Sequence, residues 1–177
     1  YPGNNFFLKN NMWGVCVKTS TFLYLSFLAS CFLLFAGFKV ATCQEGQPLK
    51  IAIIGDSLTQ GYGLRTADNL VSQLQRRLSE DNYNVELLNM GVSGDTTAGG
   101  LERFEWSISS GVVGVVIILG GNDLLRGIPP SESFQNIRSM IIKAEDRGLP
   151  VLLVGMKAPG NFGSTYKKDF DLIYFQL

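Results

Sequence analysis

Three residues at well-separated positions have the groups that ester hydrolysis needs: Ser57, Gly94 and Asn122. A serine just past a buried strand can attack an acyl carbonyl carbon when a base removes its hydroxyl proton. The attack turns the carbonyl oxygen into an oxyanion, and each donor already aimed at that oxygen is worth roughly 3–4 kcal/mol. The candidate donors are the Ser57 and Gly94 backbone amides and the Asn122 side-chain amide, which brings no charge.

Each short motif around these residues also has an ordinary structural interpretation. Asp56-Ser57 after a strand is common as a turn or a helix N-cap. Ser93-Gly94-Asp95 fits a turn with glycine at positive φ, and Gly120-Gly121-Asn122-Asp123 fits a loop closed by its own side-chain-to-backbone bonds. No single motif is specific, so the functional interpretation rests on all three occurring in order.

The elements that must position these residues follow a regular alternation. Short apolar, β-branched runs predict strands over 49–55, 84–91, 111–121 and 151–156. The run 111–121 is the most apolar and is the best candidate for the central strand. Apolar residues at helical spacing predict helices within 68–80, near 97–108, from 134 to an end at Gly148, and from 165 to 177. This alternation predicts an α/β fold with a parallel sheet, helices on both faces, and chemistry in the loops at the carboxyl ends of the strands.

Composition excludes several other kinds of chemistry. The 177 residues contain no histidine, so they cannot complete a Ser-His-Asp triad, a Cys-His pair or a His-ligated metal site. Lys and Arg number 15, as do Asp and Glu, so the basic excess that nucleic-acid binding needs is absent. The loop after the first strand lacks both glycine-rich phosphate-binding patterns, and Thr59 breaks the G-x-S-x-G pattern of an α/β-hydrolase nucleophile.

Residues 1–43 differ sharply in composition from the rest of the chain. They hold all three cysteines and three lysines but no acidic residue. The twenty residues 19–38 carry no charge and are just long enough to span a bilayer. They predict a signal peptide cleaved near Cys43, with an uncleaved membrane anchor as the close alternative and lipid attachment at Cys43 as a weaker third.

The true start of the protein is expected at Met12, which makes residues 1–11 upstream sequence. Because no cysteine follows Cys43, residues 44–177 cannot form an intrachain disulfide.

Taken in order, the polar motifs resemble the SGNH (GDSL) hydrolase family. Ser57 matches the family's nucleophile within GDSLTQGYG (55–63). Gly94 matches an oxyanion donor within NMGVSGDTTAGGLERF (89–104), and Asn122 matches the other within GGNDLLRG (120–127). With MKAPGNFGSTYKKDFDLIY (156–174), these blocks are most similar to the bacterial arylesterase / multifunctional thioesterase–lysophospholipase branch.

The resemblance covers residues 49–177 and implies a flavodoxin-like three-layer α/β/α domain. It implies a serine hydrolase that acts on small-molecule carboxylic esters, thioesters or lysophospholipids without a cofactor or metal. It also implies that residues 124–130 lie beside the acyl-binding groove. Family members are commonly exported, which agrees with a periplasmic or membrane-anchored protein whose membrane contact runs through residues 19–38.

One family block has no counterpart in this sequence. The family's Asp-x-x-His, which supplies the base and its orienting carboxylate, does not occur, and Asp169 and Asp171 lie in a helix-like run with no histidine after them. We therefore expect that the sequence stops before this block and before the last strand and helix of the domain. The alternative to an active hydrolase is an inactive truncated remnant or a membrane-tethered pseudoenzyme.

Overall fold

The computed structural model describes residues 46–177, which form one compact unit. The predicted signal or anchor segment 19–38 and the three cysteines lie outside the described residues. Within residues 46–177, no helix has the length and apolar character that crossing a membrane requires.

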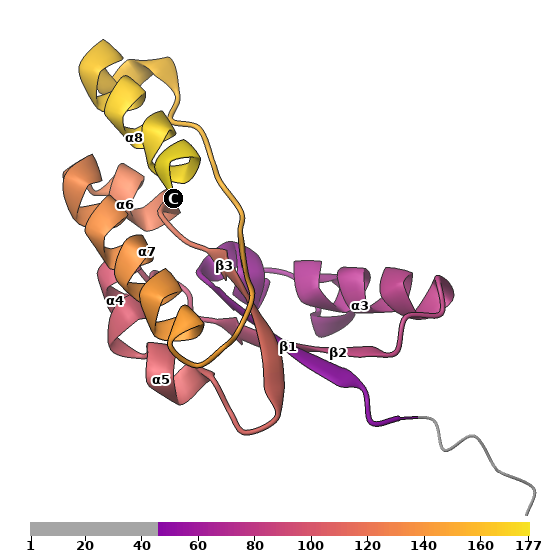
Figure 1. Ribbon diagram of the computed structural model, residues 1–177. Coiled ribbons are helices and arrows are strands. Elements are labelled where there is room, and N and C mark those ends of the chain that lie inside the picture. The colour runs from indigo at the N-terminus through magenta and orange to yellow at the C-terminus, as the bar shows by residue number, and fades with distance from the viewer. Residues whose placement is uncertain (1–45) are drawn as a thin grey trace, which may run out of the picture. The chain divides into compact units, whose positions relative to one another are not determined.

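A four-stranded parallel sheet forms the centre of the domain (Figure 1). Its strands, in the order β2-β1-β3-β4, are β1 (Leu49–Gly55), β2 (Val85–Gly91), β3 (Val112–Ile118) and β4 (Val151–Leu153). All three neighbouring pairs run parallel, as the sequence predicts. The predicted central strand, β3, has a neighbour on each side. The order is the one that begins a flavodoxin-like sheet.

Helices cover both faces of the sheet, so the predicted three-layer α/β fold is confirmed. They are α2 (Ser57–Gln60), α3 (Leu70–Glu80), α4 (Thr97–Glu102), α5 (Phe104–Ser107), α6 (Gly121–Leu125), α7 (Pro130–Glu145) and α8 (Ser164–Gln176). In Figure 1, α4, α5 and α7 lie on one side of the sheet and α3 on the other.

The core lies mainly between the sheet and the α4–α5–α7 layer. Its fully buried side chains come from both, and include Ile54, Ile117, Phe104, Ile137 and Met140. Ile53 points to the opposite face, as expected from alternation along a strand, and is buried there together with Val71 of α3. The strands are therefore held from both sides near β1, which fixes the position of their carboxyl ends.

Some predicted boundaries were wrong, and each difference has a local cause. The predicted strand 111–121 ends at Ile118, because Gly120 has φ +122° and the chain turns there into α6. The predicted strand 151–156 ends at Leu153, since Val154 makes one last bond to Ile117 and the neighbouring strand has then ended.

The predicted helix 97–108 is likewise two short helices, α4 and α5, which meet at Arg103. That boundary brings the Arg103 side chain to the ends of the strands.

Candidate active site

Ser57 is placed by the tight turn that leads from β1 into α2. Asp56 caps α2: its carboxylate accepts a hydrogen bond from the Leu58 N–H at 3.0 Å, and the side chain is almost fully buried. Ser57 is the first residue of α2, so its own N–H has no partner inside the helix. A Cβ on Gly55 would lie 1.9 Å from the Thr59 hydroxyl oxygen, which explains the glycine before the turn.

Gly94 lies in the loop between β2 and α4. Its φ of +84° is in the left-handed region that favours glycine. The Arg126 guanidinium donates to the Gly94 carbonyl oxygen at 2.8 Å, and Thr96 caps α4 by accepting from the Gly99 N–H at 3.3 Å. These two contacts hold the loop at the Gly94 carbonyl and two residues after it.

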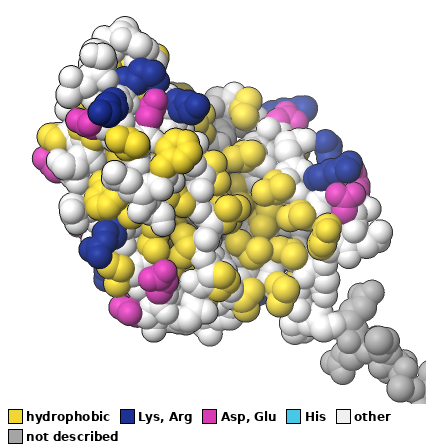
Figure 2. Space-filling view, turned by 45° about the horizontal axis from the view of Figure 1, so that its top comes forward, with side chains coloured by type: hydrophobic (Ala, Val, Ile, Leu, Met, Phe, Trp, Pro, Cys, Tyr) yellow, Lys and Arg dark blue, Asp and Glu magenta, His cyan; other side chains and the backbone are white. Residues whose placement is uncertain are grey.

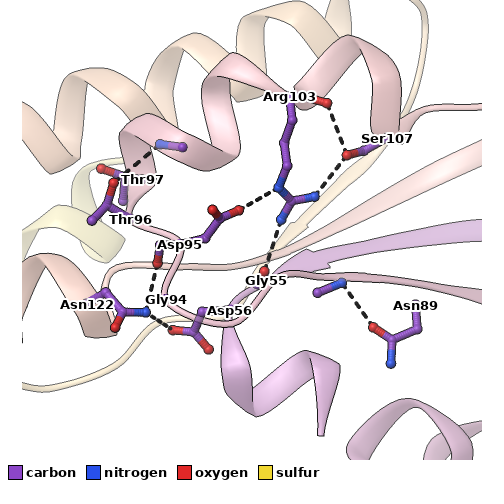
Figure 3. Close-up of polar contacts among 12 residues, drawn as sticks. Gly55, Asp56, Asn89, Gly94, Asp95, Thr96, Thr97, Arg103, Ser107 and Asn122 are labelled. Carbon is purple, nitrogen blue, oxygen red and sulfur yellow. Dashed lines mark hydrogen bonds and ion pairs between the residues drawn. The ribbon is translucent and has the colours of Figure 1, made fainter. Parts of the chain in front are cut away.

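Asn122 lies in α6, directly after the end of β3, and its side-chain amide links the other two loops (Figure 3). The amide nitrogen donates to the Asp95 carbonyl oxygen at 2.8 Å and to an Asp56 carboxylate oxygen at 3.4 Å. The first bond is short and fixes the side chain, whereas the second is long and weak. The hydrogen that points toward Asp56 is therefore the one an oxyanion could take.

These contacts bring the three predicted site residues to one edge of the sheet. Ser57 follows β1, Gly94 follows β2 and Asn122 follows β3, as the motif order predicts. The Asn122 amide bonds the residue before Ser57 and the residue after Gly94, so the three loops form one connected polar cluster. Ser57 is partly exposed at this edge. The arrangement can present a hydroxyl nucleophile and amide donors to the same acyl group.

Two residues that matter for this cluster were not assigned a role from the sequence. Asp123 is fully buried and accepts from the Thr97 N–H at 2.8 Å, the Thr97 hydroxyl at 2.5 Å and the Ser133 hydroxyl at 3.0 Å. Arg103 bonds both Gly55 and Asp95. The position of Asp123 directly after Asn122 could have suggested a role for it from the sequence. Nothing in the spacing of the motifs pointed to Arg103.

Comparison with known proteins decides the family. Residues 53–172 match the GDSL-like Lipase/Acylhydrolase family. The chain belongs to this family. It is 38% identical over 136 residues to Esterase TesA of Pseudomonas aeruginosa, covering 76% of this chain and 68% of that protein.

It is also 29% identical over 147 residues to thioesterase 1/protease 1/lysophospholipase L1 of Escherichia coli K12, covering 82% and 67% of the two chains. The chain thus spans about two thirds of the length of both relatives. Among solved structures it is similar to AlinE4, an SGNH-hydrolase family esterase, with 40% identity, a TM-score of 0.71, and coverage of 74% of this chain and 71% of that one.

In this GDSL-family domain, two tyrosines of α8 fasten that helix to the loops around the site. The Tyr174 hydroxyl donates to the Leu119 carbonyl oxygen at 2.8 Å, and the Tyr166 hydroxyl donates to the Ile128 carbonyl oxygen at 2.7 Å. Burial, followed by the negative charge of Asp123, raises the pKa of both Tyr174 and Tyr166. Both hydroxyls therefore stay neutral donors at physiological pH.

A pocket of about 500 Å³ lies between the start of α7 and α8. Its lining includes Pro129, Pro130, Phe134 and Leu172. It adjoins the end of the 124–130 loop, which the family resemblance places beside the acyl-binding groove. Ser57, Gly94 and Asn122 are not among its lining residues.

The two carboxylates near the end of the chain have the positions expected from the sequence. Asp169 and Asp171 both lie in α8, and Asp169 is exposed. Asp171 accepts from the Lys167 ammonium and the Ala158 N–H, and these two bonds, the lysine first, lower the pKa of its carboxyl. Its partners give it a role in joining α8 to the segment after β4.

Proposed function

We propose that this protein is a serine ester hydrolase in which Ser57 is the nucleophile. The observation that carries the proposal is the Asn122 amide, which bonds both Asp56 and Asp95 and so links the Ser57 turn to the Gly94 loop. Membership of a family whose named relatives are esterases and a thioesterase–lysophospholipase supports it. The substrates are small carboxylic esters, thioesters or lysophospholipids.

The reaction runs in two halves. The Ser57 hydroxyl oxygen attacks the acyl carbon while a base takes the hydroxyl proton. The Ser57 and Gly94 N–H groups and the Asn122 amide hold the oxyanion, which then collapses and expels the alcohol or thiol. Water attacks the acyl-serine in the second half and releases the acid. We place the acyl chain beside residues 124–130, the loop that the family resemblance assigns to the acyl-binding groove and whose end, at Pro129 and Pro130, lines the pocket.

This chemistry also needs a base, and the family's usual base is a histidine. The 177 residues contain none. We therefore keep a second candidate, an inactive remnant or membrane-tethered pseudoenzyme, until the gene has been read further. Reading the gene past the codon for Leu177 separates the two candidates. An Asp-x-x-His encoded downstream supports the hydrolase, and continuous divergence without it supports the pseudoenzyme.

Export to the periplasm or to a membrane, proposed from residues 19–38, is tested by fractionating cells that express the whole gene.

Acyl transfer to Ser57 tests the proposal on the chain itself. The chain is incubated with p-nitrophenyl acetate and imidazole, which supplies the missing base, and acetylated peptides are mapped by mass spectrometry. We expect acetyl-Ser57 to accumulate, since the second half of the reaction also lacks its resident base. Without imidazole we expect little or no turnover.

Matched variants give this experiment its controls. Ser57→Ala removes the acetylated site, while Ser93→Ala, which changes another serine exposed at the same edge, leaves acetylation of Ser57 unchanged. Asn122→Ala lowers the acetylation rate by roughly 10²–10³-fold, the cost of removing one oxyanion donor. Acetyl groups confined to lysines, or release of p-nitrophenol that is unchanged in Ser57→Ala, would contradict the nucleophile assignment.

A further inference from the structure

Arg103 stands where α4 ends and α5 begins, and its side chain reaches the ends of two strands (Figure 3). Its Nε donates to an Asp95 carboxylate oxygen at 2.5 Å, and one terminal nitrogen donates to the Gly55 carbonyl oxygen at 3.0 Å. The other terminal nitrogen donates to the Ser107 hydroxyl at 2.9 Å. The Arg103 and Asp95 side chains are only 21% and 16% exposed, so water screens this ion pair poorly.

Two of the three acceptors reached by Arg103, Gly55 and Asp95, belong to the proposed active site. The Gly55 carbonyl lies two residues before Ser57 and also accepts from the Val92 N–H at 3.0 Å. Asp95 directly follows Gly94, and its carbonyl oxygen accepts the short bond from Asn122. One guanidinium therefore bonds both Gly55, at the start of the turn that carries Ser57, and Asp95, whose carbonyl oxygen orients the Asn122 amide.

We propose that Arg103 is a positioning residue that sets the distance between Ser57 and the oxyanion donors Gly94 and Asn122. The inference rests on the proposed ester hydrolysis and adds a residue to its machinery. Arg103 touches no substrate; it acts through Gly55 and Asp95. Because a displacement of about 1 Å in a reacting group can cost about 10²-fold in rate, a residue that holds both loops controls acyl transfer without contacting it.

An arginine suits this position for a geometric reason. The guanidinium is a planar fork whose nitrogens point in fixed, different directions, so one side chain bonds Asp95, Gly55 and Ser107 at once. A lysine ammonium keeps the charge but is a compact point on a flexible stem, and it cannot reproduce that fork. Arg103→Lys therefore removes the simultaneous bonds to Gly55, Asp95 and Ser107 while keeping the positive charge that attracts Asp95.

Arg147 offers a matched control on the same part of the fold. Its guanidinium also makes an ion pair and a backbone bond, to Glu105 at 3.3 Å and to the Ile108 carbonyl oxygen at 3.3 Å. These bonds join the segment just after α7 to α5 and to the residue that follows it, and they do not reach the loops after β1, β2 or β3. Arg147→Lys thus reports what the loss of a bridging arginine does to structure alone.

The test measures Ser57 acetylation by p-nitrophenyl acetate and imidazole over a range of ester concentrations. For Arg103→Lys we expect the maximal rate to fall by roughly 10- to 100-fold at an unchanged half-saturating ester concentration, since donors are misplaced but the binding surface remains. Arg147→Lys is expected to match the parent chain. In ¹⁵N-correlated spectra, the Asn122 side-chain amide shifts in Arg103→Lys and stays in place in Arg147→Lys.

Asp95→Asn keeps the inference testable if Arg103→Lys fails to fold, because it keeps the side-chain shape and removes the charge that holds Arg103. It should lower the maximal rate in the same way. Equal maximal rates in the parent, Arg103→Lys and Asp95→Asn would overturn the positioning role. Loss of Ser57 specificity in the parent chain would instead overturn the proposed function, so the two failures are distinguishable.

Discussion

Two regions of the sheet are completed in very different ways. At the carboxyl edge of β1, β2 and β3, polar groups from three loops bond one another and are held by buried or half-buried side chains such as Asp123 and Arg103. On the face that carries α3, the β3–β4 half leaves apolar side chains exposed: Leu152, which is in register with Val116 and Ile53, by 60%, and Val154 by 37%. Figure 2 shows a broad hydrophobic area on this side of the molecule.

This difference shows that the polar edge is fixed by specific hydrogen bonds, whereas the exposed apolar half of the sheet is not fixed by contacts on that face. Within residues 46–177, the hydroxyl of Thr59 is the one buried side-chain polar atom without a hydrogen-bond partner. The carboxyl edge therefore has nearly all its bonds made, which is what a preorganised site needs. In the β3–β4 half of the α3 face, the side chains alternate as in any strand but have little packed against them. Single residues there therefore contribute little to the stability of the described domain.

The largest expected effect comes from removing the buried carboxylate of the polar edge. Asp123→Ala leaves the Thr97 N–H, the Thr97 hydroxyl and the Ser133 hydroxyl without their acceptor. We expect the free energy of unfolding, measured by urea denaturation, to fall by about 3 kcal/mol or more, because each unsatisfied buried group costs roughly 1–3 kcal/mol.

Asp169→Ala, which changes an exposed carboxylate of α8, is the control and should stay within about 0.5 kcal/mol of the parent. Similar losses in the two variants would show that the polar edge is not a special source of stability.

A smaller pair of effects compares the exposed β3–β4 half of the α3 face with the buried opposite face of the same strands. Ile117 of β3 is fully buried, whereas Leu152 of β4 is 60% exposed. Ile117→Val should cost about 0.5–1.5 kcal/mol although it removes one methyl group. Leu152→Ala removes more atoms and should change the free energy of unfolding by no more than about 0.5 kcal/mol, because the side chain is already in water. The reverse order in urea denaturation would mean that the exposed face is covered in solution.

Much of the fold follows from local patterns in the sequence. The runs at 49–55 and 84–91 agree with β1 and β2 to within one residue, and the leucine spacing in 68–80 marks α3. Those patterns are local and repeat at the period of the element. They do not show where β3 and β4 end, which at β3 depends on the Gly120 backbone and at β4 on the end of its neighbour.

The candidate site divides in the same way. Ser57, Gly94 and Asn122 could be predicted because each follows a strand and matches a short motif. Arg103 could not, because its partner Gly55 is 48 residues away and the link exists only after the sheet has formed. The uncovered half of the α3 face was also not predictable, since alternation identifies a strand but not which helices cover it.

The most direct measurement of the central claim is a crystal structure of the chain with a phosphonate ester attached by imidazole-assisted reaction. We expect the phosphorus on the Ser57 hydroxyl oxygen and one phosphonyl oxygen within about 2.7–3.1 Å of the Gly94 nitrogen and the Asn122 side-chain nitrogen. A phosphonate on another residue, or one on Ser57 whose oxygen points away from both Gly94 and Asn122, would contradict the account.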